Sequence, residues 1–213
     1  MNPNKDAVKA YFKELTDIAI KLVANPVDFF RSMPKSGGLI DPMLFMVVTV
    51  LIDVIMMFVE SFVKHGAGAY GFGVLIGALV IVSLIAVILS FFVAGIFYAV
   101  WSFMGSKESY ETSYRCIAYM HIVVPFTILI GVVPYLGLLG IAWWLYLIVT
   151  ATMAVHNLPA KPALLVFGII AVLAGLAYYS SVSSAIRAKE HMQEFTRELQ
   201  KMPGTDNKDS GNR

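Results

Sequence analysis

An acidic residue, Asp53, stands near the centre of the apolar run formed by residues 43–62. An unpaired charge in the middle of a membrane-spanning helix costs about 2.5–3.5 kcal/mol on insertion scales. The cost is relieved when the carboxyl group is protonated, or when a polar partner on a neighbouring helix faces it. The partners that we consider come from later apolar segments: Tyr98, Arg115, Tyr119 and His121. We predict an intramembrane polar cluster of Asp53, Arg115, Tyr119 and His121. It would bind a cation or relay protons, or it would act as a polar clamp between helices.

The residues that usually carry catalysis or bind metals lack the required spacing. His121 and His156 have no cysteine or carboxylate three or four positions away, so the spacing of a zinc site is absent. Ser102, Ser106 and Ser109 have no histidine base nearby in their loop, and no Gly-x-Ser-x-Gly motif occurs. We therefore predict no enzyme activity, no metal site and no cofactor.

The composition indicates what must surround these residues. Hydrophobic residues make up 58% of the 213-residue chain. Charged residues make up 14%, whereas soluble domains average about 25%. Only eight charged residues lie between positions 42 and 184. The single Cys116 excludes an internal disulfide, and a net charge of +2 without a basic stripe argues against nucleic acid. Soluble enzymes, disordered chains and disulfide scaffolds are excluded, which leaves a polytopic membrane protein.

Five segments are apolar enough to cross a bilayer core, which takes about 20 residues of helix. They are residues 43–62, 71–103, 114–133, 138–155 and 163–182. Period-two alternation is absent, so the fold class is all-α, with a bundle of five transmembrane helices. Pro125 interrupts the third segment and should kink it by freeing a carbonyl near residue 121. Such a break could line a cavity or could serve only packing.

The N-terminal region predicts a helix of a different kind. Residues 5–24 place apolar side chains on one face and charged side chains on the other. This pattern is typical of an amphipathic helix at the membrane interface, or of a helix packed on the bundle or on a partner. Asn25 and Pro26 should end the helix. The adjacent Phe29, Phe30 and Arg31 suggest an interfacial anchor.

These patterns divide the chain into three regions: residues 1–41, the bundle at 42–184, and a charged helical extension with a disordered tail at 185–213. A short heptad seam follows the last span and could self-associate or fold on the bundle: Ala188, Met192, Phe195, Leu199 and Met202. The Lys and Arg distribution over the short loops places the N-terminus in the cytoplasm and the C-terminus on the opposite side.

Four features occur in order and carry a family resemblance. They are Pro26-Val27-Asp28-Phe29-Phe30, then residues 113–119 followed by Pro125, then residues 133–137, and finally Trp143-Trp144 with His156 and Lys161-Pro162-Ala163. Over roughly residues 25–182 the chain resembles the Yip-domain family, membrane proteins named for interacting with Ypt/Rab GTPases. The resemblance implies five spans with a cytoplasmic N-terminus and the C-terminus on the opposite side.

The resemblance also bears on partners. Eukaryotic members are implicated in vesicle trafficking and in shaping endoplasmic reticulum and Golgi membranes, and they often carry an Asp-Leu-Tyr-Gly-Pro motif. Here residues 40–43 read Ile-Asp-Pro-Met, without the tyrosine and glycine, which puts GTPase binding in doubt. The shape is closer to bacterial members, so we expect a multi-pass protein of a bacterial cytoplasmic membrane.

Three functions are therefore under consideration. The first is a non-enzymatic membrane protein of the Yip type that acts in membrane organisation or in trafficking-like recruitment of lipids and partners. The second is a small transporter or channel that uses Asp53 and the helix break at Pro125. The third is an accessory subunit of a larger membrane complex. The expected partners are membrane lipids and either another membrane protein or a second copy of the chain.

Overall fold

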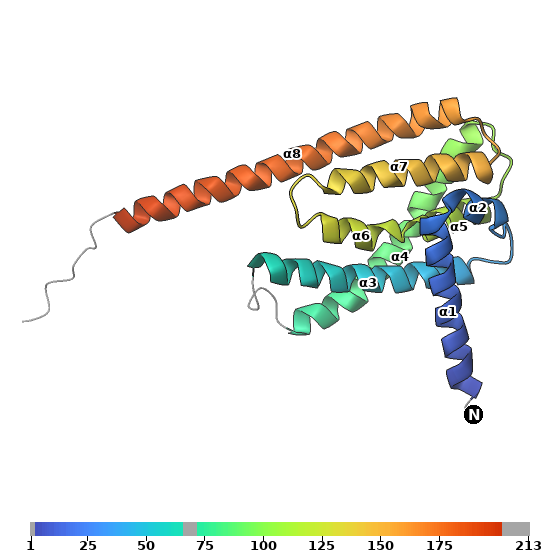
Figure 1. Ribbon diagram of the computed structural model, residues 1–213, viewed down its shortest axis with the longest axis horizontal. Helices are drawn as coiled ribbons and strands as arrows, with labels where there is room; N and C mark the ends of the chain where they lie inside the picture. The colour runs from blue at the N-terminus through green and yellow to red at the C-terminus, as the bar shows by residue number, and fades with distance from the viewer. Residues whose placement is uncertain (1–2, 66–71, 202–213) are drawn as a thin grey trace, which may run out of the picture.

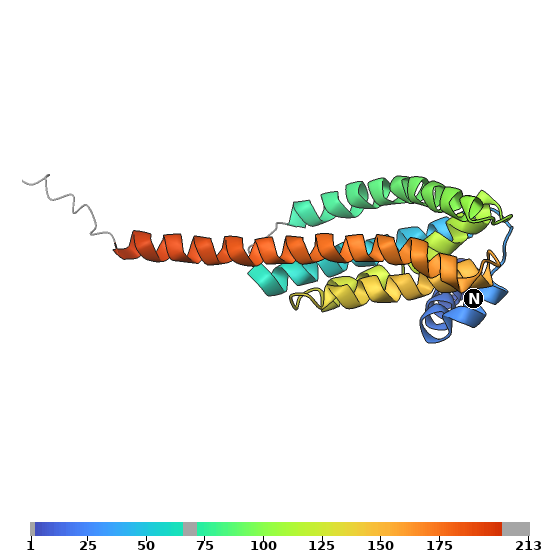
Figure 2. The same cartoon turned by 90° about the horizontal axis from the view of Figure 1, so that it is seen from above.

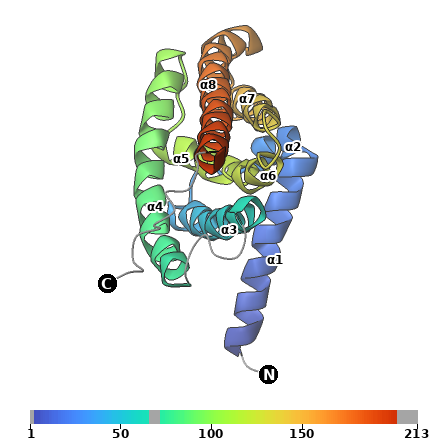
Figure 3. The same ribbon diagram turned by 90° about the vertical axis from the view of Figure 1, so that its left-hand side faces the viewer.

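The computed structural model describes residues 3–65 and 72–201, and all of their regular secondary structure is helical. The helices are α1 (Pro3–Ala24), α2 (Pro26–Ser32), α3 (Ile40–His65), α4 (Phe72–Phe103), α5 (Tyr110–Met120), α6 (Val123–Ile130), α7 (Gly137–Ala154) and α8 (Ala160–Lys201). Helices α3, α6, α7 and α8 run roughly along one long axis, whereas α4 crosses it obliquely and α1 lies across it (Figures 1 and 3).

The prediction of five apolar spans is confirmed. Five helical stretches are long and apolar enough to cross a membrane: Ile40–Val63, Gly73–Phe103, Tyr110–Ile130, Gly137–Ala154 and Ala160–Leu199. We compared the most apolar stretch of each span. In the third span 61% of this stretch is buried inside the protein, whereas in α4 only 11% is buried. The third span is therefore the centre of the bundle, whereas α4 lies at its periphery and packs on α3 and α5 through one side.

The third span is divided into α5 and α6, as Pro125 predicts. Proline has no N–H to donate, and its ring excludes the carbonyl of the residue four positions earlier, which is His121. The chain bridges the break with tighter turns, in which Ile122 N donates to Tyr119 O at 3.2 Å and Val124 N donates to His121 O at 2.9 Å.

Helix α1 lies across the end of the bundle, roughly at right angles to the spanning helices (Figures 1 and 3). Its Leu15 and Leu22 are buried, and they are part of the core that also contains residues of α2 and α5. Asn25 then caps α2, because its side chain accepts from Asp28 N at 3.3 Å. Helix α1 therefore packs on the bundle through one face.

The prediction that Phe29 and Phe30 form an interfacial anchor is wrong. Phe30 is completely buried and Phe29 nearly so, and Phe29 packs edge-on against Tyr119 with ring centroids 5.5 Å apart. Pro26, Phe29 and Phe30 lie on one face of α2, and burying that face turns α2 onto the bundle. Only Arg31 of the predicted anchor is exposed.

Helix α8 is far longer than a bilayer needs. Its 42 residues correspond to about 63 Å at the rise of an α-helix, roughly twice the hydrocarbon thickness. Figure 2 shows its C-terminal part extending alone past the ends of the other helices. Met192, Phe195 and Leu199 of the predicted seam are exposed on this part. Met202 and the tail 203–213 lie outside the described residues.

Candidate functional site

The first polar contact inside the bundle joins α3 to the end of α5. Asp53 is only 6% exposed. Its Oδ2 lies 3.5 Å from Nδ1 of His121. Among the described residues, neither Asp53 Oδ1 nor His121 Nδ1 has a hydrogen-bond partner. The structure thus places a carboxyl group and an imidazole face to face at the break in the third span, with polar atoms left unsatisfied.

Arg115 does not join this contact but fastens a loop to α5. It is 3% exposed, and its Nη2 donates to Gly38 O at 2.6 Å. Its Nε lies 3.3 Å from Glu111 Oε1, which also accepts from Gly38 N at 2.7 Å. Gly38 has φ +91°, a conformation that favours glycine. Arg115 and Glu111 therefore clamp both polar groups of one backbone position between α2 and α3.

Tyr119 belongs to an aromatic group and also forms a side-chain hydrogen bond with Arg115. Its ring packs edge-on against Phe29 and against Phe45, the latter with centroids 5.2 Å apart. Arg115 and Tyr119 are four residues apart and share one face of α5. His121 is two residues further on, which turns it by about 200° around a helix. The predicted cluster of four is consequently split into two pairs: Asp53 contacts His121, and Tyr119 forms a side-chain hydrogen bond with Arg115.

A second polar group was missed by the sequence reasoning. Trp101 Nε1 donates to Thr152 Oγ1 at 2.8 Å, and the ring of His156 stacks on Trp101 with centroids 4.0 Å apart. Ser106 Oγ lies 2.8 Å from His156 Nδ1. Ser106 thus has a histidine neighbour that the spacing in the sequence did not reveal, because the two come from different interhelical loops.

This Ser106–His156 pair does not have the geometry of a catalytic triad. Such a triad needs an acid on the second ring nitrogen, and His156 Nε2 is buried without a partner among the described residues. Burial, helped by the charge of Lys35, lowers the pKa of His156 to about 4. The ring is therefore neutral at pH 7 and acts as a packed hydrogen-bonding group.

Lys35 extends the same network to a third loop. Its Nζ lies 2.6 Å from Glu108 Oε1 and donates to Val155 O at 2.9 Å. Its own carbonyl accepts from Thr112 Oγ1 at 3.0 Å. Three interhelical loops are tied together at the end of the bundle where α1 lies. No group of three or more potential metal ligands occurs within the described ranges 3–65 and 72–201.

A hollow of about 330 Å³ lies at this end between α1, α2, α3 and α5. Its lining carries both signs of charge, from Glu14, Lys21, Asp41 and Arg115. Tyr11 also lines it, and burial, followed by the nearby Asp41 and Glu14, raises the pKa of its hydroxyl. Charged groups of this kind are stable only in contact with water or polar partners, so this end of the bundle belongs to a polar layer.

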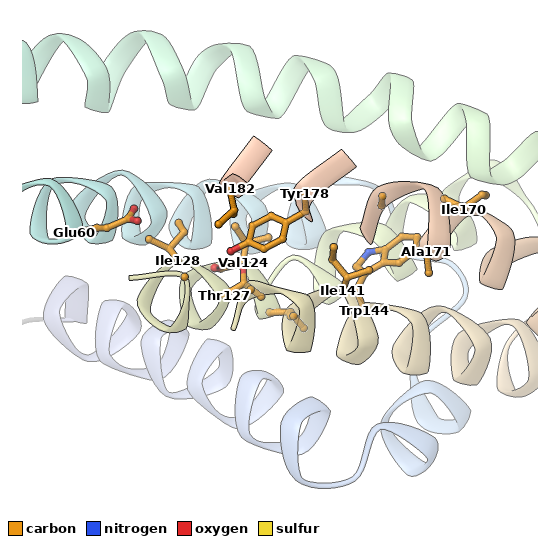
Figure 4. Close-up of a pocket in the computed structure, with 15 residues that line it drawn as sticks. Glu60, Val124, Thr127, Ile128, Ile141, Trp144, Ile170, Ala171, Tyr178 and Val182 are labelled. Carbon is orange, nitrogen blue, oxygen red and sulfur yellow. Dashed lines mark hydrogen bonds between the residues drawn. The ribbon is translucent and has the colours of Figure 1, made fainter. Parts of the chain in front are cut away.

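The other half of the bundle contains a larger, mainly apolar cavity of about 630 Å³ between the end of α3, α6, α7 and α8 (Figure 4). Most of its lining is aliphatic, glycine or Trp144, and its polar side chains are those of Glu60, Thr127 and Tyr178. The lining residues Ile170 and Ala174 are exposed, so the cavity is open at the surface of the bundle.

Comparison with known protein families identifies the family to which this chain belongs. The family model described as the Yip1 domain matches residues 20–182. The chain belongs to the Yip1 family. The Yip1 domain of this chain therefore runs from within α1 to within α8 and includes the contact between Asp53 and His121, the clamp formed by Arg115, and the cavity. No curated protein and no solved structure matches the chain.

Proposed function

We propose that this Yip1-family protein is a non-enzymatic, multi-pass membrane protein that organises the lipid layer on one side of the bilayer through α1. One observation carries the proposal. Helix α1 buries Leu15 and Leu22 against the bundle, yet Phe12, Ile20 and Val23 stay 55%, 59% and 40% exposed. Helix α1 lies across the end of the spanning helices (Figure 3), and this orientation supports the proposal that its exposed apolar side chains enter the membrane interface.

The mechanism follows from the position of α1. An amphipathic helix that inserts apolar side chains between headgroups expands the leaflet in which it lies. Because α1 is held to α2 and α5 by its buried face, this insertion is coupled to the bundle rather than to a loose tail. Glu14, Asp17 and Lys21 lie on the flank away from Phe12 and Val23, where they remain available to water or to a recruited partner.

We also propose that α1 lies on the cytoplasmic side of a bacterial cytoplasmic membrane. This end of the bundle carries Lys35 and Lys107 in interhelical loops and Lys161 in the first turn of α8. Cytoplasmic loops carry an excess of lysine and arginine, so this distribution favours a cytoplasmic position. The C-terminal end of α8 would then lie on the opposite side.

Fluorescent probes on α1 test this proposal in the full-length protein. A polarity-sensitive probe on Phe12→Cys should be quenched by lipids that carry a spin label near the headgroup, whereas the same probe on Asp17→Cys should be quenched far less. Cys116 is fully buried and should stay unlabelled. On intact cells, an impermeant thiol reagent should label Gln193→Cys and leave Phe12→Cys unlabelled. Equal quenching at positions 12 and 17 would contradict the interfacial role of α1.

The contact between Asp53 and His121 favours a second candidate, a proton or cation pathway. A carboxyl group and an imidazole that meet inside a bundle can exchange a proton. In proteoliposomes with an entrapped pH dye, this candidate predicts proton or cation flux that Asp53→Asn abolishes, since an amide keeps the polar contact but does not titrate. Equal flux in the wild type and in Asp53→Asn would leave the pair a structural clamp.

A further inference from the structure

The apolar cavity of about 630 Å³ opens to the side of the bundle. Two of its lining residues, Ile170 and Ala174 of α8, are also exposed at the protein surface. Both lie in the apolar part of a spanning helix, so the opening faces bilayer hydrocarbon rather than water. Apolar cavities of this kind exclude water and take up apolar molecules.

The lining changes in character along the cavity. Figure 4 shows Glu60 at one end, Tyr178 along its length, and Trp144, Ile170 and Ala171 towards the other end. Glu60 lies near the C-terminal end of α3, and Figure 1 shows that this end of the helix is far from α1, whereas Trp144 lies towards the middle of α7. The cavity is thus polar at its outer end and apolar at its inner end, which is the polarity of an amphiphile inserted head outward.

We propose that this cavity binds the hydrocarbon chain of one phospholipid from the leaflet opposite α1. The chain fills the space beside Trp144, Ile170 and Ala171, and the ester and headgroup lie at the end of the cavity marked by Glu60. Bilayer lipid is the apolar molecule with direct access to the opening at Ala174. The site deepens the proposed function, since α1 then engages one leaflet while the cavity engages the other.

Trp144 provides an intrinsic reporter for this site. Trp101 is completely buried, so a Trp143→Phe background leaves Trp144 as the tryptophan that lipid can reach. In proteoliposomes, phosphatidylcholine brominated near the chain end should quench Trp144 more strongly than the same lipid brominated near the carbonyl. Native mass spectrometry of the same protein should show one retained phospholipid.

Two substitutions in α8 separate bound from bulk lipid. Ala174→Phe fills the mouth of the cavity, so quenching of Trp144 should fall sharply and the retained phospholipid should be lost. The matched control is Leu173→Phe, because Leu173 is 61% exposed and does not line the cavity; it should keep both signals. Ala174→Leu should give an intermediate loss and serves as the readout if the phenylalanine variant fails to fold.

The outcomes are distinct. Equal quenching and equal lipid retention in the variants at positions 173 and 174 would overturn the proposal. A lipid that is retained with bromines near the carbonyl quenching best would also overturn it, because the chain end would not lie against Trp144. If the probe on Phe12→Cys is still quenched in either case, the interfacial role of α1 stands while the cavity proposal fails.

Discussion

Replacing Gly140 with alanine should lower the free energy of unfolding by about 2 kcal/mol, the cost of overpacking a tight contact. A Cβ at this position of α7 would lie 2.8 Å from Thr127 Cβ in α6 and nearer still to the Thr127 methyl group. Thr127 is β-branched and cannot swing its side chain away freely, so α6 and α7 would have to separate. Unfolding in mixed micelles by a denaturing detergent measures the change.

Gly168 in α8 is the matched control for this prediction. A Cβ there meets nothing within 4 Å, so Gly168→Ala should raise stability by up to about 1 kcal/mol through helix propensity. Thr127→Ser removes the crowded methyl group and should recover part of the loss in Gly140→Ala. Equal effects of alanine at positions 140 and 168 would show that α6 and α7 are not in close contact in the membrane.

Replacing Arg115 with methionine should cost about 3 kcal/mol of stability, because it removes one partner of a buried ionic contact. The substitution leaves Gly38 O without its donor and Glu111 without its cation. Arg115→Lys should recover only part of the loss, since an ammonium group cannot reach both partners in the manner of a guanidinium fork. The loss should show in the same detergent-unfolding measurement.

The exposed Arg31 on α2 is the control for Arg115. Arg31→Met changes the net charge equally but removes no buried contact, so stability should change by less than about 0.5 kcal/mol. Glu111→Gln should be milder than Arg115→Met, because an amide still accepts from Gly38 N. If Arg115→Met is as harmless as Arg31→Met, the clamp does not hold the loop between α2 and α3.

The bundle was predictable from the sequence because the apolar composition of a segment determines whether that segment can cross a membrane. Long apolar runs separated by prolines, glycines and charges predict spans whatever their mutual arrangement. The break at Pro125 was predictable for a local reason, since a missing N–H acts within one helical turn. Both predictions depend on local sequence alone: the composition of one continuous segment for a span, and one helical turn for the break.

The contacts between distant segments were not predictable in this way. Ser106 and His156 are separated in the chain by the whole of α5, α6 and α7, and only the packing of helix ends brings them together. The face of α2 that carries Phe29 and Phe30 suits either lipid or protein, and its burial depends on α2 folding onto α5. The split between Arg115 and His121 was available from helix geometry alone, since two residues beyond Tyr119 turn a side chain to the opposite side.

The length of α8 determines how far from the membrane its C-terminal side chains lie. Counted from residue 183, beyond the apolar run, the helix continues to Lys201, a further distance of about 28 Å. Met192 and Phe195 are therefore exposed on a part of the helix that lies beyond the lipid surface. A partner that bound these side chains would be held at a fixed distance from the bilayer, and shortening or lengthening the helix by whole turns would change that distance.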